Sequence, residues 1–163
     1  MKNITVMLKP ASSACNMRCR YCFYADVSSL RDCPSYGLMT AEVRERVIKN
    51  IFASLAPGDR LNLAFQGGEP TLAGLDWFRA LTEQVRAIGK GVRVSYSLQT
   101  NGLLLDDEWC AFLRSTASWW ASLWTAMPKT ITPAAPTTRA RAPSPGSWRR
   151  SSGWTATGWT IMC

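Results

Sequence analysis

Apolar and polar residues alternate in three short segments, and this period of two predicts three β-strands. The segments are ITVML at residues 4–8, RLNLAFQ at residues 60–66 and VRVSYSL at residues 92–98. Each strand runs into a loop rich in cysteine, glycine or side-chain amides. The pattern therefore predicts a sheet whose strand ends carry the chemically distinctive residues.

Between these strands the apolar residues recur at helical spacing. In MTAEVRERVIKNIFASL they are Val43, Val47, Ile48, Ile51 and Leu55. Thr40 is a suitable N-cap residue, and Pro57 with Gly58 predicts the end of this segment. A second helix is expected from about residue 75 to residue 88, before Gly89, and a third from about Asp106.

Strand, loop and helix follow one another three times, an order typical of a parallel α/β sheet or barrel. In such folds the loops at the carboxyl ends of the strands carry the chemistry. Three cysteines follow the first strand, QGGEP (residues 66–70) follows the second, and QTNG (residues 99–102) follows the third. We expect these three loops to meet at the carboxyl edge of the sheet and to form one site.

The amino-acid composition and charge exclude several classes of partner and of catalytic or metal site. The net charge is +8, but residues 115–163 contain five basic residues and no acidic one, so the excess belongs mainly to the tail. No basic run is interleaved with aromatic residues, so nucleic acid is not an expected partner. There is no apolar stretch of membrane-spanning length and no signal-peptide pattern, so no membrane partner and a cytoplasmic location are expected. Histidine is absent, which excludes imidazole chemistry and Cys2His2 zinc sites.

Cys15, Cys19 and Cys22 are spaced C-x3-C-x2-C. In a reducing cytosol, clustered cysteines indicate metal ligands more often than disulfides. A structural zinc site needs four ligands, and neither Cys33 nor Cys110 stands at a standard partner spacing. A zinc site with three thiolates and a water remains open. In a cubane iron–sulfur cluster, three thiolates leave one iron open to a ligand, and S-adenosylmethionine can chelate such an iron before an electron breaks its sulfonium bond.

CNMRCRYC, with an aromatic residue before the last cysteine, resembles the signature of the radical S-adenosylmethionine superfamily, and GGEP resembles its second motif. The resemblance implies a [4Fe-4S] cluster and S-adenosylmethionine as cofactors. The implied metal ligands are Cys15, Cys19 and Cys22. The implied residues around S-adenosylmethionine are Tyr21, Gly67, Gly68, Glu69, Gln99 and Asn101, where Glu69 would pair with the methionine amino group.

CNMRCRYCFYADVS, FQGGEPTLAG and YSLQTNGLLLDDEW together resemble the anaerobic sulfatase-maturating enzymes, a SPASM-type family. These enzymes oxidise a cysteine or serine of a sulfatase to formylglycine. The resemblance places Tyr24 and Gln66 near the peptide substrate, although both also suit an ordinary polar rim. Asn101 and Gly102 also suit a simple turn, because Asn and Gly tolerate positive φ.

The implied partners are a sulfatase or another peptide substrate and an electron donor such as flavodoxin or ferredoxin. No residue of the chain matches the family's catalytic base, so the chain by itself is expected to be inactive. One alternative is another peptide-modifying radical maturase. A non-enzymatic alternative is a small metal-binding protein whose basic tail contacts a partner.

We divide the chain into residues 1–114, the N-terminal part of the radical domain, and residues 115–163, a tail expected to have little order. The tail holds six of the eight tryptophans and the Pro-rich stretch PAAPTTRARAPSPG. Tryptophan and methionine each have a single codon, and in the overlapping frame the tail is compatible with GFLVGISLDG, which resembles the family's next strand. We therefore expect a frameshift near residue 115, a partial (β/α) barrel of about three units, and an exposed edge on the third strand.

Overall fold

The computed structural model describes residues 1–20, 22–89, 91–116, 119–123, 131–133 and 159–160. The main sheet has the strand order β1-β3-β4-β5-β7. Its strands are β1 (Asn3–Leu8), β3 (Arg60–Phe65), β4 (Arg93–Thr100), β5 (Trp119–Leu123) and β7 (Trp159–Thr160). The first four strands are parallel, and β7 pairs antiparallel with β5.

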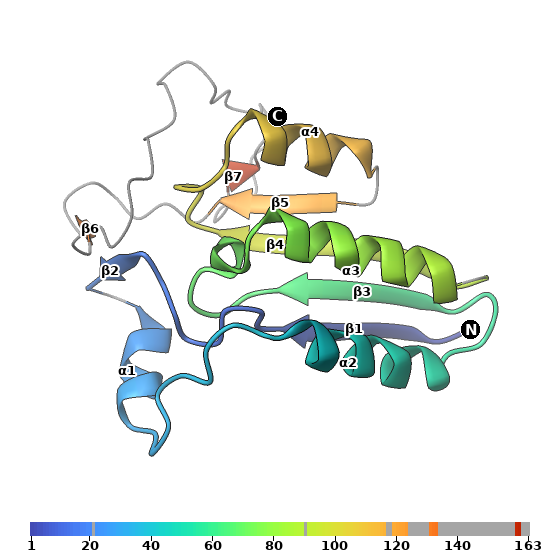
Figure 1. The fold of residues 1–163 in the computed structure, drawn as a ribbon, viewed down its shortest axis with the longest axis horizontal. Helices are drawn as coiled ribbons and strands as arrows, with labels where there is room; N and C mark the ends of the chain where they lie inside the picture. The colour runs from blue at the N-terminus through green and yellow to red at the C-terminus, as the bar shows by residue number, and fades with distance from the viewer. Residues whose placement is uncertain (21, 90, 117–118, 124–130, 134–158, 161–163) are drawn as a thin grey trace.

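Three main helices connect the parallel strands and cover one face of the sheet (Figure 1). They are α2 (Ala41–Ala53), α3 (Leu75–Ile88) and α4 (Asp107–Ser115). A short 3-10 helix, η1 (Pro70–Ala73), precedes α3. The cysteine segment contains β2 (Met17–Cys19) and α1 (Phe23–Ser29), and β2 pairs antiparallel with β6 (Ile131–Pro133). The three β/α units predicted from the sequence are confirmed.

The predicted starts of the first and third main helices are also confirmed. The Thr40 hydroxyl accepts a hydrogen bond from the Val43 backbone N–H, and the Asp106 carboxylate accepts one from that of Trp109. These side chains satisfy backbone donors that a helix start otherwise leaves unpaired. The third main helix therefore begins where the sequence predicted.

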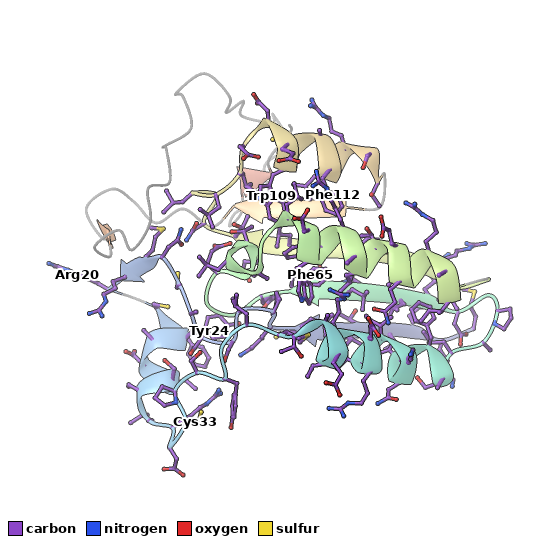
Figure 2. The ribbon with its side chains drawn as sticks, viewed as in Figure 1. Arg20, Tyr24, Cys33, Phe65, Trp109 and Phe112 are labelled. Atoms are coloured by element: carbon purple, nitrogen blue, oxygen red, sulfur yellow. The ribbon has the colours of Figure 1, made fainter. Side chains whose placement is uncertain are left out.

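The core lies between the sheet and these helices. The parallel register aligns three apolar rows across β1, β3 and β4: Ile4–Leu61–Val94, Val6–Leu63–Tyr96 and Leu8–Phe65–Leu98. Phe78 of α3 packs edge to face on Phe65 and on Trp109 of α4, with ring centroids 5.1 and 5.2 Å apart. Figure 2 shows Phe65 and Trp109 in this layer. The apolar residues at alternate strand positions thus fix the register. A slip of one strand by one residue would turn its apolar side chains away from the core.

The opposite face of the sheet carries polar and small side chains. Asn62 donates a hydrogen bond from its amide to the Ser97 hydroxyl, and the Ser95 hydroxyl donates to the Asn62 amide oxygen. Ala64 lies between Met7 and Ser97 in the next row. This face suits the inner wall of a barrel, where polar residues approach the mouth.

One expectation about the sheet was wrong. The third predicted strand is not an edge, because β4 pairs along Tyr96 to Thr100 with β5. The five residues of β5 lie in the segment assigned to the tail. The Pro-rich centre of that segment lies outside the described residues, so its expected lack of order and the frameshift stay predictions. Among the described helices, none is long and apolar enough to cross a membrane.

Candidate cofactor site

A cavity of about 210 Å³ opens at the carboxyl ends of β1, β3 and β4. Its walls come from the three loops that the sequence predicted to converge. The lining residues are Cys15, Met17, Cys19, Cys22, Phe23, Tyr24, Gly67, Gly68, Glu69, Gln99, Thr100 and Asn101. All predicted site residues except two line the cavity. Gln66 lies next to it, and Tyr21 lies outside the described residues.

The three cysteines of the first loop are free thiols that face this cavity. The Cys15 sulfur accepts hydrogen bonds from the Met17 backbone N–H at 3.4 Å and from the Asn101 amide at 3.9 Å. Partial removal from water raises the pKa of the Cys15 thiol, the Met17 hydrogen bond opposes this, and the charges of Glu69 and the other two cysteines raise it further.

The donor set suits an iron–sulfur cluster. Among the described residues, no three Cys, Asp or Glu side chains converge on one metal-ion position. A cubane cluster does not require this, because each thiolate binds a different iron. Cys33 lies beyond the far end of α1, away from the cavity (Figure 2). Cys110 lies half-buried on α4.

We call residues 66–70 the glycine loop and the segment with Cys15, Cys19 and Cys22 the cysteine loop. The glycine loop packs directly on the cysteine loop. Gly68 has φ +52°, and a Cβ at this position would lie 2.1 Å from the Ala14 carbonyl oxygen. The next residue, Glu69, donates its backbone N–H to the same oxygen at 2.7 Å. Only glycine permits this approach, which brings the two loops together as two walls of one cradle.

The Glu69 carboxylate is buried and bound by protein donors. One oxygen accepts hydrogen bonds from the Thr71 backbone N–H and hydroxyl and from the Thr100 hydroxyl. The other oxygen accepts from the Asn101 backbone N–H at 2.7 Å. The carboxylate therefore ties the end of β3 to the end of β4. Sequence reasoning missed this role, since Thr71 and Thr100 are unremarkable in a linear pattern.

Asn101 combines the two roles that the sequence left open. Its side-chain oxygen accepts from the Leu103 backbone N–H at 3.0 Å, and Gly102 has φ 76°, as in a local turn. Its amide nitrogen also donates to the Asn16 side chain at 2.8 Å and to the Cys15 sulfur. The turn residue thus also supports the cysteine loop. Gln99 lines the cavity beside it.

Tyr24 and Gln66 meet at the edge of the cavity. The Tyr24 hydroxyl donates to the Gln66 side-chain oxygen at 3.4 Å. Tyr24 lies on the first turn of α1 and reaches toward the strand ends (Figure 2). The ammonium of Lys9, a residue not singled out from the sequence, lies 4.6 Å from the centre of the Tyr24 ring.

The chain is similar in sequence to proteins of known function. A cysteine-type anaerobic sulfatase-maturating enzyme of Clostridium perfringens is 45% identical over 114 residues, which are 69% of this chain and 30% of that protein. A serine-type enzyme of Klebsiella pneumoniae is 39% identical over 110 residues, which are 67% of this chain and 27% of that protein. The chain thus spans under a third of the length of these relatives.

The solved structure of native anSMEcpe with bound AdoMet and Cp18Cys peptide superposes with a TM-score of 0.69 at 37% identity. That likeness covers 80% of this chain and 35% of that one. The model of the radical SAM superfamily matches residues 10–123, which include the cysteine loop, the glycine loop and β5. The chain therefore belongs to the radical SAM superfamily.

Proposed function

We propose that the chain carries the cluster- and S-adenosylmethionine-binding part of a maturase that oxidises a cysteine or serine of a sulfatase to formylglycine. The observation that carries the proposal is the meeting of three free thiols with the Gly67-Gly68-Glu69 loop in one cavity. The likeness to cysteine-type and serine-type sulfatase maturases supports the substrate class.

Cys15, Cys19 and Cys22 would hold a [4Fe-4S] cluster, which when bound supplies an open iron and the electron for reductive cleavage of S-adenosylmethionine. The glycine loop would present its backbone to the methionine end of the cofactor. Glu69 would hold this backbone in place through its bonds to Thr100 and Asn101. The charge of its carboxylate would also favour a nearby methionine ammonium.

Tyr24 and Gln66 would stand on the peptide side of the cavity, where their paired hydroxyl and amide can orient a backbone or side chain. The expected base is not among the predicted site residues of this chain. The electron would come from a flavodoxin or ferredoxin. We therefore propose that this chain alone binds both cofactors and forms no formylglycine.

The test is anaerobic reconstitution of the chain with iron and sulfide, followed by reduction in the presence of S-adenosylmethionine. The proposal expects 5′-deoxyadenosine from the wild type and none from Cys15→Ala. Cys33→Ala is the matched control, because Cys33 lies outside the cavity, and it should behave as wild type. Absence of 5′-deoxyadenosine from a wild type that holds a full cluster would contradict the proposal.

The substrate class needs a second experiment. Residues 10–123 of this chain would replace the matching segment of the Clostridium perfringens relative, and the chimera would be given a cysteine-containing sulfatase peptide. Formation of an aldehyde, trapped with a hydrazine reagent, is the expected result. A chimera that makes 5′-deoxyadenosine but no aldehyde would favour a different peptide substrate.

A further inference from the structure

Lys9 directly follows β1, at the top of the polar face of the sheet. Along β1 the residues toward the core are Ile4, Val6 and Leu8, and the alternate positions lead to Met7 and then Lys9. The Gln66 backbone N–H donates to the Leu8 carbonyl oxygen at 3.1 Å, so the two strands still run together at this level. Lys9 and Gln66 therefore both lie at the carboxyl ends of neighbouring parallel strands, β1 and β3.

The aliphatic stem of Lys9 crosses the glycine loop. A Cβ built on Gly67 would lie 2.7 Å from the Lys9 Cδ and 2.9 Å from its Cε. Gly67 also has φ +79°, a conformation that residues with a side chain rarely adopt. The glycine thus leaves the space through which the lysine stem passes, and the half-buried stem lies against the cofactor loop.

The charged end of Lys9 lies against Tyr24. Its Nζ is 4.6 Å from the ring centre, within the range in which an ammonium is attracted by the face of an aromatic ring. The hydroxyl of the same ring donates to Gln66 at 3.4 Å. One ring is therefore held by a cation at its face and by an amide at its hydroxyl.

We propose that Lys9 is a positioning residue, which holds the Tyr24 ring at the mouth so that Tyr24 and Gln66 present a paired hydroxyl and amide to a peptide substrate. The peptide part rests on the proposed function. Lys9 links the two sides of the site, since its stem packs on the glycine loop and its ammonium acts on the peptide side. The charge of Lys9, and not its aliphatic stem, should hold the Tyr24 ring in position. Arginine at position 9 should therefore preserve the ring position, and methionine should not.

The primary test is NMR of the full chain with ring-labelled tyrosine, in which the Tyr24 resonance among four tyrosines is assigned with Tyr24→Phe. Lys9→Met should shift the Tyr24 resonance, and Lys9→Arg should largely restore it. Lys49→Met is the control, because it removes an exposed lysine of α2. An unchanged Tyr24 resonance in Lys9→Met would overturn the positioning role, whether or not the chain cleaves S-adenosylmethionine.

The second test measures the affinity of a labelled cysteine-containing sulfatase peptide for the reconstituted chain with S-adenosylmethionine. Lys9→Met should weaken it by about three- to tenfold, the range of one half-buried cation–π contact. Lys9→Arg should stay within about twofold of wild type. A shifted Tyr24 resonance with unchanged peptide affinity would overturn the peptide part. If the reconstituted wild-type chain forms no 5′-deoxyadenosine, the proposed function is contradicted instead.

Discussion

The carboxylate of Glu69 accepts a hydrogen bond at 2.7 Å from the backbone N–H of Asn101, a residue 32 positions further along the chain. This contact joins the loop after β3 to the loop after β4. The side chain of Asn101 then reaches the cysteine loop through Asn16 at 2.8 Å. The three loops therefore form one connected structure, and changes in one are expected to alter the other two.

Glu69→Gln should destabilise the fold and lower iron incorporation. A glutamine has one acceptor oxygen, so its NH2 group would face either the Asn101 N–H or the donors from Thr71 and Thr100. A buried donor without an acceptor costs about 1–3 kcal/mol. Urea unfolding should show a lower midpoint for this variant. Glu83→Gln, at an exposed position of α3, is the control and should unfold as wild type does.

Gly68→Ala should be more destabilising than Gly37→Ala. Both glycines have positive φ, so both substitutions add backbone strain, but a Cβ on Gly37 meets nothing within 4 Å. A Cβ on Gly68 would collide with the Ala14 backbone, and overpacking of this kind adds about 1–3 kcal/mol. Urea unfolding and iron content per chain measure the two effects. Equal results for the two variants would show that the loops do not need this close approach.

Asn101→Ala should lower the midpoint potential of a bound cluster. The Asn101 amide donates to the Cys15 sulfur at 3.9 Å, and N–H donors to cluster sulfurs stabilise the more negative reduced state. The measurement is a redox titration of the reconstituted chain followed by electron paramagnetic resonance. An unchanged potential at unchanged iron content would mean that the amide acts only on the loop.

Asp59 should stabilise the fold above acidic pH. Hydrogen bonds from the backbone N–H groups of Lys2 and Ala56 lower the pKa of this carboxyl below its usual value. Because the folded-state pKa lies below the unfolded one, the contribution is present above the unfolded pKa of about 4 and is lost as the pH falls further. Unfolding midpoints measured across this range should fall less steeply for Asp59→Asn. If the unfolding midpoints of wild type and Asp59→Asn fall equally steeply as the pH decreases, this account is contradicted.

The parts of the fold that follow from local pattern were predictable. The strands at Ile4, Leu61 and Val94 could be recognised because one face is apolar and the other polar, and the helices because Thr40 and Asp106 are strong capping residues. The cysteine loop and the glycine loop could be placed because parallel strands end at the same edge of a sheet.

The remainder depends on contacts between distant segments. WWASL shows no alternation, and β5 is recognisable only through its pairing with β4. The contact between Lys9 and Tyr24 likewise joins a strand end to a helix start. The role of Glu69 as a link between loops depends on Thr100, which the sequence placed in the QTNG loop without any distinct role. Such pairings appear only when the chain is folded.

The central claim is that Cys15, Cys19 and Cys22 hold a cluster at a cavity that also takes S-adenosylmethionine. The most direct measurement is electron paramagnetic resonance of the anaerobically reconstituted and reduced chain, with and without S-adenosylmethionine. The account predicts a cluster signal that S-adenosylmethionine changes and that the triple Cys→Ala variant lacks. A colourless wild type with tightly bound zinc, or a cluster signal that persists in the triple variant, would contradict it.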